Sequence, residues 1–230
     1  MFGGPGYDGF LWFIGIITDI DDPKKLGRVR VRLITEQTPE LGSAETADVQ
    51  NSDLPWAIVG MPVTSASLFG LGQSPTGIKV GSKVVGFFLD GLEKTKPFVM
   101  FTFNTIDNGD VNRHSVSRYA RGEGAVQKDY VEDFEPITKY KAEYPFNNTI
   151  TTQSGHVIEI DDTPNSERIH IYHKSGSYTE INPDGSIVTK SVKDDTEVVV
   201  GKKSSFSKKD TNIAAGSTLR IVSDKDVKID

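Results

Sequence analysis

The sequence predicts an all-β protein, and three observations lead to this prediction. Apolar and polar residues alternate over short segments such as 168–172 (RIHIY), which is the two-residue period of a β-strand. The breaks between such segments are turn sequences, and the chain holds 22 Gly and 11 Pro among its 230 residues. No segment shows the period of an amphipathic helix. The stretch from Ser154 to Asp184 shows this pattern most clearly, because strands and turns alternate there with almost no residue between them.

The composition excludes several classes of protein and site. Apolar residues make up 36% and charged residues 25% of the chain, as in a soluble protein with a modest core. The net charge of −6 argues against a general nucleic-acid binder, which normally carries a basic surplus. Because there is no cysteine, disulfides, zinc–cysteine sites and thiol nucleophiles are excluded. The apolar run at residues 11–17 is too short to span a bilayer and is expected to form a buried strand.

Five strands are predicted in the first 105 residues. Each is a run rich in β-branched and aromatic residues, and polar turns containing Gly or Pro separate the runs. This number and spacing of strands is typical of a small closed β-barrel such as an OB-fold, so we expect residues 1–105 to form an OB-fold domain. The predicted strands cover residues 11–18, 28–34, 54–59, 78–89 and 98–103, the fourth in two pieces that are broken at Gly81.

Three arginines alternate with apolar residues in the second predicted strand. Arg28, Arg30 and Arg32 therefore share one face of that strand. One interpretation is a surface for nucleic acid. We favour the other, a solvated face or a face that meets an acidic partner, because no aromatic side chains interleave with the arginines to stack bases.

Residues 106–148 differ from what precedes and follows them. The segment is polar, charged and weakly patterned, with aromatic residues at intervals. A structureless loop of this length inside one domain is uncommon, so we interpret the segment as an extended linker between two domains.

An eight-residue apolar period begins after Gly185. Two apolar positions in eight residues correspond to a short strand and a turn, and one chain cannot bury so narrow a stripe alone. We therefore expect residues 149–230 to form a β-helical needle in which several chains share one thin core. The predicted core residues are Val198, Val200, Leu219, Ile221, Val227 and Ile229.

Several long segments resemble one known family in the same order along the chain. Residues 154–164 (SGHVIEIDDTP) and 167–188 (ERIHIYHKSGSYTEINPDGSIV) resemble the start of the C-terminal spike in T4-like phage baseplate central spike proteins and in type VI secretion (VgrG) spike proteins. Residues 13–33, 53–67 and 80–91 resemble the N-terminal OB domain of the T4-like spike family.

The resemblance implies a homotrimer with a structural role in the virion. Three OB domains would attach to a baseplate hub protein and close the tail tube. Below them, three chains would intertwine into a β-helix or β-prism that pierces the host outer envelope when the contractile tail contracts. The particle would be assembled in the host cytoplasm, and a small PAAR-like protein would cap the blunt end of the needle.

One departure from the family pattern changes the expected activity. T4-like spike proteins carry a lysozyme domain between the OB domain and the needle, whereas only residues 106–148 lie there in this chain. The carboxylates of that segment have no apolar pocket to raise a pKa, so we assign no catalytic residue and expect no enzyme. The alternatives are a baseplate peptidoglycan hydrolase, by family analogy, and a VgrG-type secretion spike.

No cofactor or metal site is expected either. His170 and His173 are three residues apart in a predicted strand and so point to opposite faces, while His114 and His156 lie far from both in sequence. The paired carboxylates at Asp161 and Asp162 do not follow the spacing of a calcium loop and are better explained as turn residues.

Overall fold

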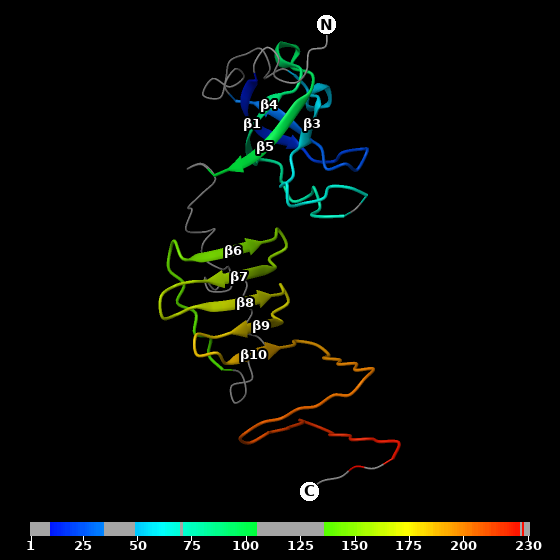
Figure 1. The fold of residues 1–230 in the computed structure, drawn as a ribbon, viewed down its shortest axis with the longest axis vertical. Helices are drawn as coiled ribbons and strands as arrows, with labels where there is room; N and C mark the ends of the chain where they lie inside the picture. The colour runs from blue at the N-terminus through cyan, green and yellow to red at the C-terminus, as the bar shows by residue number, and fades with distance from the viewer. Residues whose placement is uncertain (1–9, 35–48, 70, 105–135, 226, 228–230) are drawn as a thin grey trace.

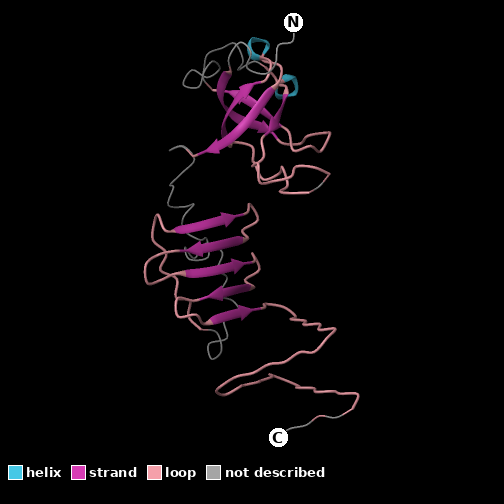
Figure 2. Ribbon diagram, in the orientation of Figure 1, coloured by secondary structure: helices cyan, strands magenta, loops and turns pink. Residues whose placement is uncertain are grey.

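The computed structural model describes residues 10–34, 49–69, 71–104, 136–225 and 227. These residues contain ten strands, two short 3-10 helices and no α-helix, so the predicted all-β class is confirmed (Figure 2). The strands form two separate sheets, a closed five-stranded barrel and an open five-stranded sheet. In Figure 1 the barrel, the open sheet and the C-terminal segment follow one another along the longest axis.

The barrel is the predicted OB-type barrel. Its strand order is β1-β2-β3-β5-β4, with β3 and β5 parallel and every other neighbouring pair antiparallel. The segments that connect its strands include the 3-10 helices η1 (Asn51–Asp53) and η2 (Gly91–Glu93). The strands are β1 (Leu11–Asp19), β2 (Val29–Leu33), β3 (Trp56–Val59), β4 (Lys83–Phe88) and β5 (Pro97–Phe103).

Only one of two predicted strand pieces forms in residues 78–89. The prediction placed a break at Gly81, and the piece after it is β4, which starts at Lys83. Gly81 has a φ of 90°, and the amide of Ser82 donates to the carbonyl of Lys79 in a tight turn. The structure thus has a turn at the predicted break, whereas the predicted piece before it, residues 78–80, is not a strand.

The barrel core is apolar and well enclosed. Alternate residues of each strand point inward, as the two-residue period requires. Gly86 allows this packing, because a Cβ at that position would lie 2.1 Å from the carbonyl oxygen of Phe98 and 2.6 Å from the ring of Phe13. The fully buried residues are Phe13, Ile17, Val29, Val31, Ala57, Val84, Phe88 and Val99.

The open sheet is an antiparallel meander. Its spatial order, β10-β9-β8-β7-β6, is the chain order reversed, so each strand pairs with its neighbour in sequence. Figure 1 shows the strands stacked along the long axis of the molecule, each running across that axis. The strands are β6 (Asn147–Thr151), β7 (Val157–Asp161), β8 (Arg168–Tyr172), β9 (Tyr178–Ile181) and β10 (Ile187–Lys190).

Three of the turns in this sheet share one geometry. In residues 152–156, 173–177 and 182–186, the amide of the first residue donates to the carbonyl of the fifth, and the amide of the fourth donates to the carbonyl of the first. The fourth residue is Gly155, Gly176 or Gly185, with φ between 79° and 101°. Glycine adopts this left-handed backbone without strain, which explains its place in each turn.

The C-terminal segment after β10 has no strand among its described residues. Figure 1 shows it running back and forth below β10. Its apolar side chains are exposed, including those predicted to form a shared core, so the β-helical needle stays a prediction. The exposed fractions are 81% for Val198, 103% for Val200, 57% for Leu219, 64% for Ile221 and 52% for Val227, whereas Ile229 lies outside the described residues.

Candidate functional site

One face of the open sheet is covered with exposed isoleucines, and we call it the isoleucine face. The strand register aligns Ile160 with Ile169, then Ile181 and Ile187, in a row that crosses four strands. Between 36% and 66% of each isoleucine is exposed. A contiguous apolar surface of this kind marks an interaction site. The face contains Ile150, Ile158, Ile160, Ile169, Ile171, Ile181 and Ile187.

The opposite face of the same sheet is buried and charged, and we call it the ionic face. Arg168 lies between two glutamates: its Nη2 is 2.5 Å from Oε2 of Glu159, and its Nη1 is 2.7 Å from Oε1 of Glu180. His170 completes the cluster, with its Nδ1 3.5 Å from Oε2 of Glu159. The side chains of these four residues are at most 3% exposed.

The cluster holds Glu159 in its charged form. Burial raises the pKa of Glu159, but the hydrogen bond with His170, the attraction of Arg168 and a hydrogen bond from Asn147 outweigh it, so the pKa lies below its ordinary value. The amide nitrogen Nδ2 of Asn147 lies 2.6 Å from Oε1 of Glu159. The side chain is therefore a structural anion rather than a proton donor.

Residues 136–146 cover the ionic face, and we call them the strap. The hydroxyl of Thr138 donates to Oε1 of Glu180 at 2.9 Å, and the ring of Tyr140 lies 4.9 Å from the guanidinium carbon of Arg168. Further along, the amide of Glu143 donates to the hydroxyl of Thr163 at 2.9 Å. The strap thus belongs to the expected linker of residues 106–148, whose first thirty residues lie outside the described part of the chain.

The barrel carries a second apolar surface, on its outside. The ring of Phe87 packs against Phe10 at 4.8 Å, Trp12 at 5.5 Å and Phe98 at 5.2 Å between centroids. Phe10 is 49% and Trp12 55% exposed. We call these four residues the aromatic patch.

The comparisons with known proteins agree with this architecture. The family described as the Gp5 N-terminal OB domain matches residues 38–197, a stretch that includes β3 to β5 of the barrel and the whole open sheet. This chain belongs to the Gp5 OB-domain family.

Two relatives of this Gp5-family chain are phage proteins. Protein Gp5 of Vibrio phage KVP40 is 30% identical over an alignment 270 residues long. The alignment covers 90% of this chain and 64% of that protein. The pre-baseplate central spike protein Gp5 of Enterobacteria phage T4 is 32% identical over 173 residues, covering 75% of this chain and 26% of that protein. The chain thus spans about two thirds of one relative and about a quarter of the other. Within its described residues, no helix has the length and apolarity to cross a membrane.

One of the two predictions about the histidines of the Gp5-family chain is confirmed, and the other missed a contact. His170 is buried on the ionic face and His173 is exposed, so these two point to opposite faces. His156 was set aside as distant in sequence, yet its ring lies 4.4 Å from the ring of His173. The register of β7 and β8 could have shown this, since Val157 pairs with Tyr172. His114 lies outside the described residues.

The arginine row of β2 is engaged within the barrel. Arg28 pairs with Asp22 at 2.6 Å, and this contact holds the pKa of that carboxyl well below its usual range. Arg30 lies 3.7 Å from Asp19 and bonds the carbonyl of Asn51. Nη2 of Arg32 donates to the carbonyl of Val49 at 2.7 Å and to Oδ1 of Asn51 at 2.9 Å.

No aromatic residue interleaves with these arginines along β2, but one packs on them from the neighbouring strand β3. The ring of Trp56 lies 4.6 Å from the guanidinium carbon of Arg30 and 5.6 Å from that of Arg28. The strand register explains the contact, because Arg30 pairs with Trp56 across β2 and β3. The indole thus packs on arginines that already hold protein partners, which supports the structural interpretation of the row.

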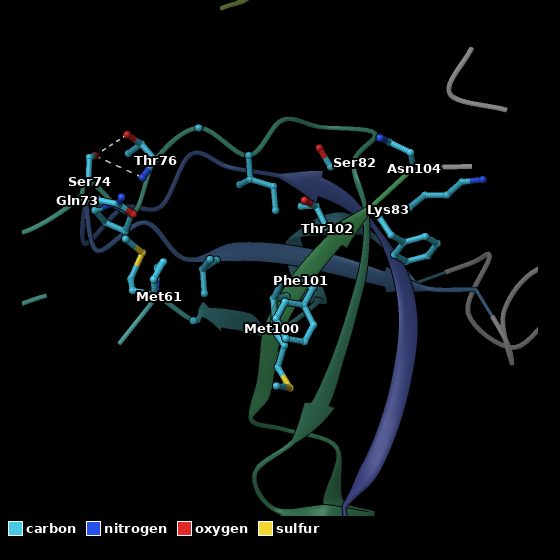
Figure 3. A pocket seen from close by; sticks show the side chains of 18 residues that line it. Met61, Gln73, Ser74, Thr76, Ser82, Lys83, Met100, Phe101, Thr102 and Asn104 are labelled. Atoms are coloured by element: carbon cyan, nitrogen blue, oxygen red, sulfur yellow. Dashed lines mark hydrogen bonds between the residues drawn. The ribbon is translucent and has the colours of Figure 1, made fainter. Parts of the chain in front are cut away.

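A hollow of about 470 Å³ lies on the barrel between the loop of residues 60–78 and strand β5 (Figure 3). Phe101, Thr102 and Asn104 line one side, while Gln73 and Ser74 line the loop side. No carboxylate or imidazole is among its lining residues, and Lys83 is the one ionisable side chain among them. Among the described residues there is also no group of three or more side chains placed to hold a metal ion.

Proposed function

We propose that this chain is the structural central spike of a contractile phage tail baseplate and acts as a homotrimer. The uncovered isoleucine face carries the proposal. Full burial of an isoleucine contributes about 1.5–3 kcal/mol, so a single chain that leaves seven of them exposed forgoes much of its stabilisation. Three isoleucine faces turned toward a common axis would recover it.

The proposed organisation follows the two sheets. Residues 1–105 form the OB domain, residues 106–148 the linker and residues 149–230 the needle. Below β10, the exposed apolar residues of the C-terminal segment would meet their counterparts from the other two copies in an intertwined β-helix. Shared strands make such a shaft stiff, because bending it breaks many backbone hydrogen bonds at once, and they also remove free sheet edges.

The barrel is the proposed attachment point. Its aromatic patch offers an exposed, neutral surface for the baseplate hub, where three barrels would close the tail tube. The relative from phage T4 is named a pre-baseplate central spike protein, which supports a function in the virion. Assembly in the host cytoplasm belongs to the same proposal. On contraction the needle would cross the host outer envelope, with a PAAR-like protein capping its blunt end.

We infer a mechanical rather than an enzymatic role. A glycosidase needs a carboxylic acid with a raised pKa and a second carboxylate beside it. In the described residues the two buried glutamates of the ionic face, Glu159 and Glu180, share the Arg168 guanidinium, and the pKa of Glu159 lies below its ordinary value rather than above it. A zymogram of the purified chain on cell-wall material should stay uncleared, and clear lysis would overturn this inference.

The oligomeric state tests the proposal directly. Light scattering of the full chain should give the mass of three copies, and the assembly should resist SDS. The variant Leu219→Asp should lose that assembly, because it places a charge in the proposed shared core. A wild-type chain that stays monomeric at all concentrations would overturn the spike, whereas a monodisperse, SDS-resistant trimer of Leu219→Asp would remove the needle core from the proposal.

A further inference from the structure

The two ends of the isoleucine face carry opposite chemistry. Strand residues Val157 and Tyr172 are buried on the ionic face, as are Asp161 and Arg168 at the other end of the same two strands. Alternation therefore places the next residue beyond each strand end on the side of the isoleucine face. These outer residues are His156 and His173 at one end and Asp162 and Glu167 at the other.

The histidine end presents two hydrogen-bond donors. The Nδ1 atom of His156 accepts from the amide of Lys174 at 3.4 Å, and the Nδ1 atom of His173 accepts from the amide of Ser175 at 3.2 Å. A backbone amide can only donate, so the proton of each neutral ring lies on Nε2. Both rings can therefore donate outward from Nε2, and the exposed ammonium of Lys174 adds positive charge beside them.

The carboxylate end presents acceptors. Asp162 and Glu167 are exposed and are positioned by backbone contacts: the amide of Asp162 donates to the carbonyl of Phe146 at 3.2 Å, and Oε1 of Glu167 accepts from the amide of Asn165 at 3.3 Å. Ionised carboxylates accept hydrogen bonds only, and bonds from imidazole donors suit them.

The two ends cannot meet within one chain. Six residue steps separate His156 from Asp162, which at about 3.3 Å per residue is about 20 Å. That separation exceeds the Debye length of about 8 Å at physiological ionic strength. Between copies the situation differs. The strands run across the long axis (Figure 1), so in a ring of three copies with inward isoleucine faces, one end of each sheet adjoins the opposite end of the next.

We propose that the histidine end of each copy binds the carboxylate end of its neighbour at the three corners of the shaft. The Nε2–H groups of His156 and His173 donate to the carboxylates of Asp162 and Glu167 in the neighbouring copy. Each contact site is incomplete in a single chain, and a head-to-tail ring completes all three at once. This contact adds a specific polar determinant of the rotational order and register of the copies to the apolar contact of the isoleucine faces. It rests on the proposed trimer.

Charge reversal and charge exchange test the contact. The variant D162K/E167K replaces the acceptors at every corner with ammonium groups, which cannot accept from the Nε2–H donors and which repel Lys174. It should raise the concentration at which the trimer half-dissociates by at least about tenfold. Adding H156E/H173E to the same chain exchanges the two ends and should restore most of the loss. Rescue requires contact between copies, because the exchanged ends are too far apart to interact within one chain. The milder variant D162N/E167Q keeps the side-chain shape and should weaken the trimer in the same direction.

Matched controls separate this contact from other effects. The variant D21K/E93K makes the same change in net charge on exposed barrel positions and should leave the trimer unchanged. Two results would overturn the corner contact alone, provided that the wild-type chain is a trimer. One is that adding H156E/H173E to D162K/E167K does not restore the trimer. The other is that D162N/E167Q leaves the trimer unaffected. A trimer lost on treatment with EDTA would also overturn it, in favour of a bridging metal. A wild-type chain that is monomeric would instead overturn the proposed function.

Discussion

The barrel and the open sheet bury opposite kinds of residue. The barrel encloses apolar side chains such as Phe13 and Ile17, and no charged residue belongs to that core cluster. The open sheet encloses Glu159, Arg168 and His170 and leaves its isoleucines in contact with solvent. The barrel closes on itself and so completes its core within one chain. The sheet completes only an ionic core within one chain, and its apolar face is left for a partner.

The difference has an energetic consequence. A buried ion pair contributes little net stability relative to apolar packing, although losing one partner is costly. The apolar core of the sheet in a single chain is small: Val157, Tyr172 and Tyr178, with Val188 packed against them. We therefore expect the barrel to be stable alone and the sheet to depend on assembly.

The largest expected effect follows from a charge on the isoleucine face. Ile169→Asp places a carboxylate in the middle of that face and should reduce the mass measured by light scattering from three chains to one. The barrel should remain folded, and both tryptophans, Trp12 and Trp56, report on it by fluorescence. A trimer that survives this substitution would contradict the assignment of the face.

The ionic face should respond next most strongly. Arg168→Ala leaves two buried glutamates without their cation and should cost about 3–5 kcal/mol in the unfolding of the sheet. Hydrogen exchange of the β7 and β8 amides measures this locally. Lys96→Ala, an exposed cation on the barrel, is the matched control and should change little. Equal effects of the two substitutions would show that the ion pairs are not structural.

Acid should weaken the sheet through Glu159. Because the pKa of Glu159 is lowered in the folded chain, its contribution to stability is complete above its ordinary value of 4.5 and is lost as the pH falls toward the folded pKa. The sheet of Glu159→Gln should therefore start less stable but lose less stability between neutral and acidic pH than wild type. Parallel pH profiles would contradict the role assigned to this carboxylate.

A small core change in the barrel gives the smallest expected effect and isolates that region. Ile17→Val removes one buried methylene and should cost about 0.5–1.5 kcal/mol. The change should appear in tryptophan fluorescence, while the trimer mass and the hydrogen exchange of β7 and β8 stay as in wild type. A shift in the sheet amides would show that the two regions unfold together.

The alternation of residues made much of this fold predictable. In β7 and β8 the isoleucines alternate with the buried residues, so the positions of these strands and the face of each residue follow from the sequence alone. The pattern could not show which face the chain would cover. That depends on the strap, where Thr138 and Tyr140 contact groups about thirty or more residues away in sequence.

Side-chain partners across strands were harder to foresee. The contacts of Trp56 with the arginine row and of His156 with His173 both follow from strand register, which depends on turn length as well as on the apolar pattern. The break at Gly81 before β4, by contrast, was predictable from the glycine itself.

The repeated five-residue turns stack the strands at a constant spacing, so the height of the sheet follows from the number of its strands. Strands lie about 4.8 Å apart, so five of them span about 19 Å along the axis. Inserting two more strands with two such turns would lengthen the shaft by about 9.6 Å and leave the chain direction and both faces unchanged. One extra strand would reverse the direction in which the chain leaves the sheet. The reach of the shaft can therefore change in steps of two strands, by duplication of a segment of under twenty residues.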